Sequence, residues 1–134
     1  MFKLIKVFTL AFSLITTTLI AGEVPEISQQ QLLEALTASN NNIVLLDVRS
    51  KDEYNEGHVA GAINISHNEI KDNIALLTQY KKSKVVVYCR SGRRAAFAQN
   101  ILSENGFTNL HHLTGDMNAW TNADLPVVVG ENKE

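Results

Sequence analysis

The sequence predicts an α/β fold built around a mostly parallel central sheet. Two continuous apolar runs at 43–48 and 84–88 are rich in β-branched residues and have the length of strands buried on both faces. Between and after them, apolar residues repeat every three or four positions, which is the period of helices packed on a sheet. The chain has 134 residues and shows no linker or internal repeat, so we expect one domain.

Two helices near the start are marked by capping residues. A helix is expected at 29–36, with Ser28 as its N-cap. Another is expected at 50–55, where Ser50 is the N-cap and Glu53 follows three residues later, the spacing of a capping box. Each serine can satisfy backbone N–H groups that a helix start leaves unpaired.

The rest of the chain continues to alternate between strands and helices. After the first buried strand we expect a strand at 62–65, a helix at 68–80, the second buried strand at 84–88, a helix at 93–105, a strand at 110–113, a helix at 115–122 and an extended piece at 125–129. Strands separated by helices in this way favour parallel pairing.

The first residues have the order of a secretory signal peptide. Two lysines precede an uncharged apolar run at 7–21, and small residues follow before an acidic segment. The run is shorter than the roughly 20 residues that span a bilayer. We therefore expect residues 1–21 to be a signal peptide, cleaved after Ala21 or Gly22, and 22–134 to be the mature domain; retention of the segment as a membrane anchor is the alternative. That domain would be exported, to the periplasm where the source has one, and would not stay associated with the membrane.

Composition excludes several classes of function. The net charge is −2, and removal of Lys3 and Lys6 with the signal would make it −4, so a general nucleic-acid binder is not expected. A single cysteine excludes an intramolecular disulfide and a multi-cysteine zinc site. His111 and His112 are adjacent on a predicted strand and point to opposite faces, so we expect neither a metal nor another cofactor.

The cysteine stands at the position where chemistry is expected in such a fold. Cys89 follows the second buried strand and precedes a helix, and open α/β sheets place ligands at this edge. The start of a helix offers unpaired N–H groups and a positive dipole end, which favour anions and thiolates. A lone cysteine can also be a small buried apolar residue or a partner for another molecule's thiol.

The neighbours of Cys89 favour a reactive thiol. Ser91 and Gly92 are small, so the backbone can curl closely around a ligand. Arg90, Arg93 and Arg94 are three of the four arginines in the chain, and they concentrate positive charge in an otherwise acidic protein.

Several motifs resemble those of single-domain rhodaneses. The loop at 89–94 resembles the family's Cys-x-x-Gly-x-Arg active loop. Segments 46–49, 53–54 and 57–65 resemble its first signature, and 113–115 with Trp120 resembles its C-terminal signature. Asp116 stands where the family commonly has a second glycine. The resemblance covers about 27–126, which would be the core of the domain, and it implies a three-layer fold with helices on both sides of the sheet.

The resemblance implies a sulfurtransferase. Cys89 would attack the sulfane sulfur of a small anionic donor such as thiosulfate and hold it as a persulfide. A thiol, a protein sulfur acceptor or cyanide would then remove that sulfur. The donor would be bound by the five residues that follow the cysteine, Arg90, Ser91, Gly92, Arg93 and Arg94. Among the arginines, Arg94 ranks first as a ligand-binding or structural residue, and Arg93 would face either the donor or solvent.

Residues outside the loop have supporting roles. Asp47 ends the first strand and would either orient the loop as a supporting acid or cap the strand, and the cap is favoured. Arg49 and Glu53 are four residues apart and can pair. The resemblance implies that His58 supports the fold. Trp120 would lie either in the core or at the rim of the pocket, and the core is favoured.

Two alternative functions remain. The same fold can carry a persulfide to a partner, or bind that partner, without turnover. Related phosphatases place five residues between cysteine and arginine, whereas four residues, 90–93, separate Cys89 from Arg94 here. A phosphoryl group needs room for three equatorial oxygens. Phosphatase or arsenate reductase activity therefore ranks below sulfur transfer.

Overall fold

A five-stranded sheet forms the centre of the computed structural model, which describes residues 23–39 and 41–131. Its order is β1-β5-β4-β2-β3, and every neighbouring pair is parallel. The strands are β1 (Glu26–Ile27), β2 (Ile43–Asp47), β3 (Ile63–Asn64), β4 (Lys84–Tyr88) and β5 (Leu110–Leu113). The predicted α/β fold is confirmed, and its sheet is parallel throughout.

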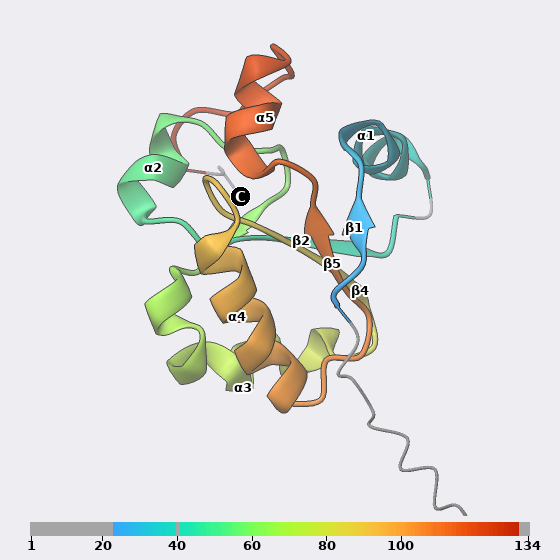
Figure 1. Cartoon of the computed structure of the whole chain (residues 1–134), viewed down its shortest axis with the longest axis vertical. Coiled ribbons are helices and arrows are strands. Elements are labelled where there is room, and N and C mark those ends of the chain that lie inside the picture. Colours follow the sequence, from blue (N-terminus) through green and yellow to red (C-terminus); the bar gives the residue numbers. More distant parts are fainter. Residues whose placement is uncertain (1–22, 40, 132–134) are drawn as a thin grey trace, which may run out of the picture.

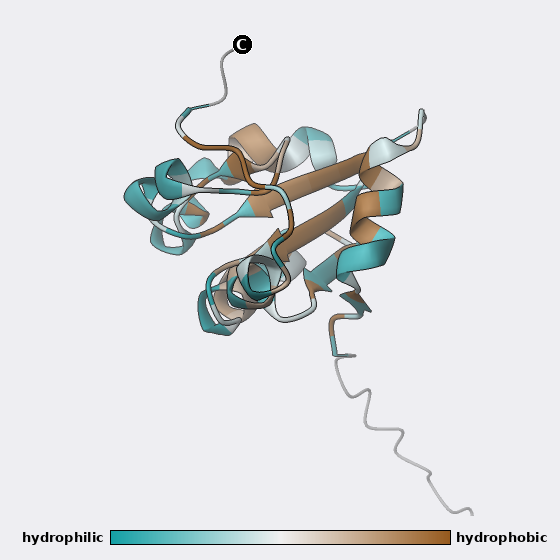
Figure 2. Ribbon diagram, turned by 90° about the horizontal axis from the view of Figure 1, so that it is seen from above, coloured by the Kyte–Doolittle hydropathy of each residue, from teal (hydrophilic) through white to brown (hydrophobic). Residues whose placement is uncertain are grey.

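Helices cover both faces of the sheet and give three layers (Figure 1). One face carries α1 (Gln29–Thr37), α2 (Lys51–Glu56) and α5 (Asp116–Asn122), and the other carries α3 (Ile74–Leu77) and α4 (Arg93–Glu104). The strands are apolar, as the brown ribbon segments in Figure 2 show, and they lie between the two helix layers of Figure 1. This is the arrangement that a parallel sheet requires, because both of its faces must be shielded from water.

Alternation along β4 divides the core between the two layers. Val85 and Val87 belong to the cluster on the α3 and α4 side, whereas Val86 and Tyr88 belong to the cluster on the α1, α2 and α5 side. All four are at most 3% exposed, which explains why this strand is a continuous apolar run in the sequence.

Both predicted helix caps are present. The Ser28 hydroxyl accepts a hydrogen bond from the Gln31 N–H at 3.1 Å, and the Ser50 hydroxyl accepts one from the Glu53 N–H at 3.2 Å. In each case the side chain three residues later accepts from the serine N–H, so both are capping boxes.

The prediction of one regular helix at 68–80 was wrong. The segment forms three 3-10 turns, His67–Glu69, Lys71–Asn73 and Thr78–Tyr80, around the single α-turn of α3. Ile70 and Leu77 are still buried, so the apolar spacing was correct. Asn73 and Thr78 side chains donate to backbone carbonyls within the segment, and such bonds compete with regular helix formation.

At both ends of the described chain, the structure differs from the elements that the sequence predicted. β1 is a two-residue edge strand that pairs with β5, and it was not predicted because two residues show no period. The extended piece predicted at 125–129 is a tail held by one antiparallel bridge. Val128 and His58 exchange backbone hydrogen bonds of 2.8 and 2.9 Å.

The topology brings two loops together at one edge of the sheet. β2 and β4 are parallel neighbours, and Asp47 of β2 is in register with Tyr88 of β4. From their carboxyl ends the chain enters α2 on one face and α4 on the other. Such a switch point is where open α/β sheets hold ligands.

The signal peptide predicted at 1–21 lies outside the described residues. Among residues 23–39 and 41–131, no helix has the length and apolar character needed to cross a membrane.

Candidate active site

Cys89 begins a tight loop between β4 and α4. The Gly92 N–H donates a hydrogen bond to the Cys89 Sγ at 3.0 Å, so the loop turns back over its own sulfur. Gly92 is the N-cap of α4 and has a φ of 113°, a left-handed conformation that suits glycine. The side chains of Cys89 and of the helix start are thus brought together by backbone geometry.

The thiol is enclosed by its loop. Cys89 is 1% exposed, whereas Arg90 and Ser91 beside it are exposed. The near-complete burial of the residue leaves a reagent little direct access to the Sγ. The Gly92 N–H that contacts the sulfur belongs to the N-cap of the twelve-residue α4, whose first N–H groups have no carbonyl partner within that helix. The environment of the thiol is therefore small and electropositive.

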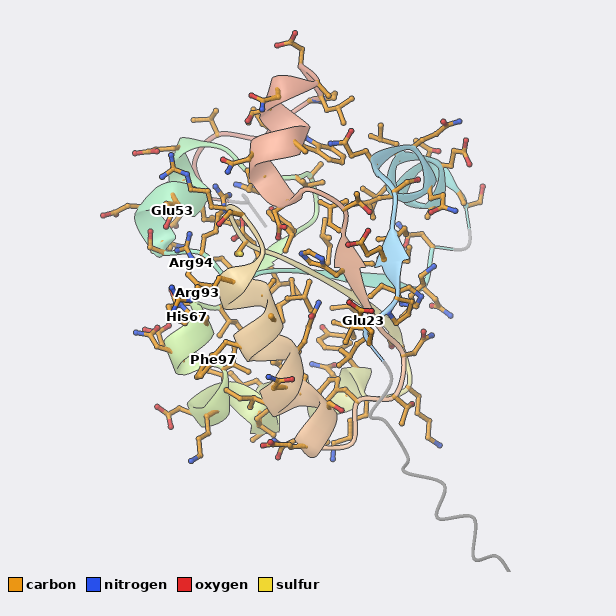
Figure 3. The ribbon with its side chains drawn as sticks, viewed as in Figure 1. Glu23, Glu53, His67, Arg93, Arg94 and Phe97 are labelled. Atoms are coloured by element: carbon orange, nitrogen blue, oxygen red, sulfur yellow. The ribbon has the colours of Figure 1, made fainter. Side chains whose placement is uncertain are left out.

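The three loop arginines differ in their surroundings. Arg90 and Arg93 are exposed, whereas Arg94 forms a two-pronged ion pair with Glu53, with N–O distances of 2.7 and 3.0 Å. Figure 3 shows Glu53 and Arg94 next to each other at the start of α4. The hydrogen bonds from Arg94 lower the pKa of Glu53 to about 2. Arg94 joins α4 to α2 and thus the two faces of the sheet.

The predicted Arg49–Glu53 pair was wrong, because both residues have other partners. Arg49 pairs with Asp47 at 2.6 Å, and it also donates to the Gly57 carbonyl at 2.8 Å. Asp47 is fully buried, and a buried carboxylate needs such a partner. Asp47 also accepts a hydrogen bond from the Arg49 N–H at 2.9 Å, so it ends β2 in the manner of a cap.

His58 and Trp120 lie in the interior. His58 is fully buried, stacks on the Tyr54 ring with centroids 3.6 Å apart, and hydrogen-bonds the Tyr54 carbonyl through Nδ1 at 2.8 Å. Trp120 is 1% exposed, and its Nε1 donates to the Pro126 carbonyl at 2.9 Å. Both side chains therefore contribute to packing, as the sequence predicted.

The sequence did not predict that Asp116 supports the loop. Its Oδ1 accepts a hydrogen bond of 2.9 Å from the Cys89 N–H. Two backbone bonds run alongside, from the Met117 N–H to the Cys89 carbonyl and from the Asn118 N–H to the Arg90 carbonyl, at 3.0 and 3.1 Å. The start of α5 is thus fastened to the start of the loop. The only signal in the sequence was the departure from glycine at this position.

His112 completes the contacts of Asp116. Its Nε2 lies 2.9 Å from both carboxylate oxygens, and its Nδ1 lies 3.8 Å from Oε1 of Glu26. The hydrogen bond to Asp116 raises the pKa of His112 above its ordinary value. His111 lies beside a different groove, and burial lowers its pKa. Across the described ranges, no three His, Cys, Asp or Glu side chains gather to form a metal site.

A groove of about 710 Å³ lies beside the Cys89 loop. It separates α4 from the segment that leads into β1, and Gly92 and His112 lie at one end. In Figure 3 Glu23 lies on this side of α4, whereas Arg93, Arg94 and Phe97 lie on the other. Gly92 is therefore common to the thiol loop and to the wall of the groove.

Comparison with known proteins supports the same family. Residues 28–123 match the rhodanese-like domain family. Thiosulfate sulfurtransferase PspE of Escherichia coli is 43% identical over 70 residues, which is 52% of this chain and 67% of that protein. YrkF of Bacillus subtilis, named a candidate sulfur carrier protein, is 28% identical over 101 residues, 75% of this chain and 53% of YrkF.

A solved structure from Escherichia coli described as a rhodanese with anions has a similar fold. Its TM-score is 0.56 with 38% identity, and the match covers 66% of this chain and 99% of that chain. The two curated relatives are matched over about two thirds and about half of their own lengths. The match to the rhodanese-like domain family, over residues 28–123, includes the Cys89 loop.

Proposed function

This chain belongs to the rhodanese-like domain family, and we propose that it is a sulfurtransferase that uses Cys89 to move a sulfane sulfur from a thiosulfate-type donor to a thiol or cyanide. The observation that carries the proposal is the 3.0 Å hydrogen bond from the Gly92 N–H to the Cys89 Sγ. It places a backbone donor on the sulfur that would bear negative charge in both the thiolate and the persulfide.

The reaction needs two displacements. In the first, the Cys89 thiolate attacks the outer sulfur of thiosulfate, the S–S bond of the donor breaks, and sulfite leaves with the bonding electron pair. In the second, an acceptor thiolate or cyanide attacks the terminal sulfur of the persulfide. The Cys89 thiolate is regenerated, and the acceptor leaves as a persulfide or as thiocyanate.

The loop favours sulfur over phosphorus as the transferred atom. Four residues separate Cys89 from Arg94, and the Gly92 N–H already contacts the sulfur. A loop closed this tightly holds one or two sulfur atoms more readily than a phosphoryl group with three equatorial oxygens. The exposed Arg90 and Arg93 would attract a dianionic donor, while Arg94 is already paired with Glu53.

Mass spectrometry of the intact protein tests the first displacement. Incubation with thiosulfate should add the mass of one sulfur atom, and a reducing thiol should remove it. Cys89→Ser is the matched control and should gain nothing. Absence of the adduct in the folded parent protein would refute the assigned role of Cys89.

Steady-state formation of thiocyanate from thiosulfate and cyanide tests the second displacement. The parent protein should turn over, and Cys89→Ser should not. Sulfur loading without turnover would indicate a carrier, as the name of YrkF suggests for that protein. Faster hydrolysis of a phosphate ester than formation of thiocyanate would favour a phosphatase.

We also propose that residues 1–21 direct export of the chain and are then removed. The support is the order of the first residues: two lysines, an uncharged run at 7–21 and small residues before the acidic segment. N-terminal sequencing of the protein from a secreting host should begin at residue 22 or 23. A protein that retains Met1 would contradict cleavage.

A further inference from the structure

We propose that Asp116 is a positioning residue that holds the Cys89 loop in the conformation that stabilises the thiolate, and that His112 balances the charge of Asp116. The contacts that hold the loop do not depend on the proposed function, whereas their role in catalysis rests on that function. Asp116 acts through the backbone of Cys89, and His112 acts through Asp116.

Contacts at both ends of the loop carry the proposal. At its first residue, the Asp116 Oδ1 accepts the Cys89 N–H at 2.9 Å. At its fourth residue, a Cβ added to Gly92 would lie 3.2 Å from the Asp116 Oδ2 and within 3.7 Å of the His112 ring. The Gly92 N–H in turn donates to the Cys89 Sγ. The pair therefore contacts Cys89 directly and occupies the space beside Gly92, and these two residues form the hydrogen bond to the sulfur.

The backbone at Asp116 is strained. Its φ is 54°, left-handed, and it directly follows Gly115 with a φ of 75°. The second glycine that the family commonly has would adopt this conformation more easily. A non-glycine residue keeps such a conformation where surrounding contacts hold it. Here those contacts are the hydrogen bonds to Cys89 and His112.

Charge explains why the pair has two members. Asp116 is 1% exposed, and alone its negative charge would oppose a thiolate on the same loop. His112 donates to it from Nε2 at 2.9 Å, and the hydrogen bond to Asp116 raises the pKa of His112. The other acidic groups on this side are Glu26 and Glu23, while α4 contributes uncharged residues: Ala96, Gln99, Asn100 and Ser103.

The pH dependence of alkylation tests the charge balance without sulfur chemistry. In His112→Gln the side chain still donates to Asp116 but carries no charge. The midpoint of the rate of Cys89 alkylation by iodoacetamide against pH should move up by about one to three pH units, the effect of one unbalanced charge about 4–10 Å away at an effective dielectric constant of about 20. The double variant H112Q/D116N restores a neutral pair and should return the midpoint to within a few tenths.

The neighbouring histidine is the control. His111→Gln removes the same type of side chain from the same strand and should leave the midpoint unchanged, because His111 lines a different groove. An unchanged midpoint in folded His112→Gln, or a midpoint that stays shifted in the double variant, would overturn the proposal. A shifted midpoint in a protein that never takes sulfur from thiosulfate would leave the inference standing and refute the proposed function.

Amide hydrogen exchange decides the case if His112→Gln fails to fold. Asp116→Asn can still accept the Cys89 N–H, whereas Asp116→Gly cannot, although glycine suits the left-handed backbone. The Cys89 amide should exchange at least tenfold faster in the glycine variant than in the asparagine variant. Equal exchange in both would show that the side chain of Asp116 does not hold the loop.

Discussion

At the scale of single residues, the ion pair between Glu53 and Arg94 makes a testable contribution to stability. The hydrogen bonds from Arg94 lower the pKa of Glu53 from 4.5 to about 2. The lowered pKa belongs to the folded state, so the stabilisation is complete above pH 4.5 and is lost as the pH falls toward 2. Both side chains are 28% exposed, so solvent screening limits the effect to about 1 kcal/mol.

Urea denaturation at a series of pH values measures this contribution. Glu53→Gln should lower the free energy of unfolding by about 1 kcal/mol at pH 7 and much less near pH 2. Glu131→Gln removes an acid whose pair with Lys51 is largely exposed, and it should cost little at either pH. A loss in Glu53→Gln that does not depend on pH would contradict the ion-pair explanation.

Gly92 combines a backbone requirement with a spatial one. Gly92→Ala should cost at least about 1–2 kcal/mol because the φ is positive, and it should also reduce sulfur loading by pressing on Asp116. Gly61 has a φ of 82° with nothing within 4 Å of an added Cβ, so Gly61→Ala isolates the backbone cost. Thermal unfolding and loading kinetics should show stability loss in both variants and slower loading only in Gly92→Ala.

The sequence predicted one side of this site and not the other. Their loop could be predicted because Cys89 and Gly92 are close in the chain and because the strand before them is a continuous apolar run in the sequence. Asp116 contacts Cys89 across 27 positions, and the link to His112 joins a strand to a helix. Neither contact leaves a periodic pattern. Arg49 likewise pairs with the buried Asp47 because desolvation outweighs helical spacing.

At the scale of elements, α2 matters because it presents Glu53. Ser50→Ala removes the cap, and it should cost about 1 kcal/mol of stability and allow the Glu53 side chain to shift. Ser28→Ala removes a similar capping box from α1 and serves as the matched control. Both variants should lose similar stability, but only Ser50→Ala should slow sulfur loading. Equal loading rates would show that α2 does not act on the loop.

The elements also show why the pattern predicted some structures better than others. β2 and β4 were predicted because central parallel strands must be apolar on both faces. The segment 67–80 kept its buried positions but lost its helix to Asn and Thr side chains that bond the backbone. β1 could not be predicted because its two residues carry no pattern of their own, and it is a strand only through its pairing with β5.

At the scale of the whole molecule, the fold both prepares and shields one thiol. The switch point between β2 and β4 places the loop between the two helix layers, and the Glu53–Arg94 pair joins those layers there. Cys89 remains 1% exposed within this arrangement. Burial can protect a lone thiol from disulfide exchange with large partners, while local opening admits small anions.

Reagents of different size test this shielding. The ratio of the alkylation rate in denaturant to that in the native protein measures protection of Cys89. Protection against a bulky aromatic disulfide should exceed protection against iodoacetamide by at least tenfold, because opening for the larger reagent must displace more of the loop. Equal protection against both would mean that the thiol reacts only after global unfolding. A small donor would then have no local route to Cys89, and rapid sulfur loading of the native protein could not occur.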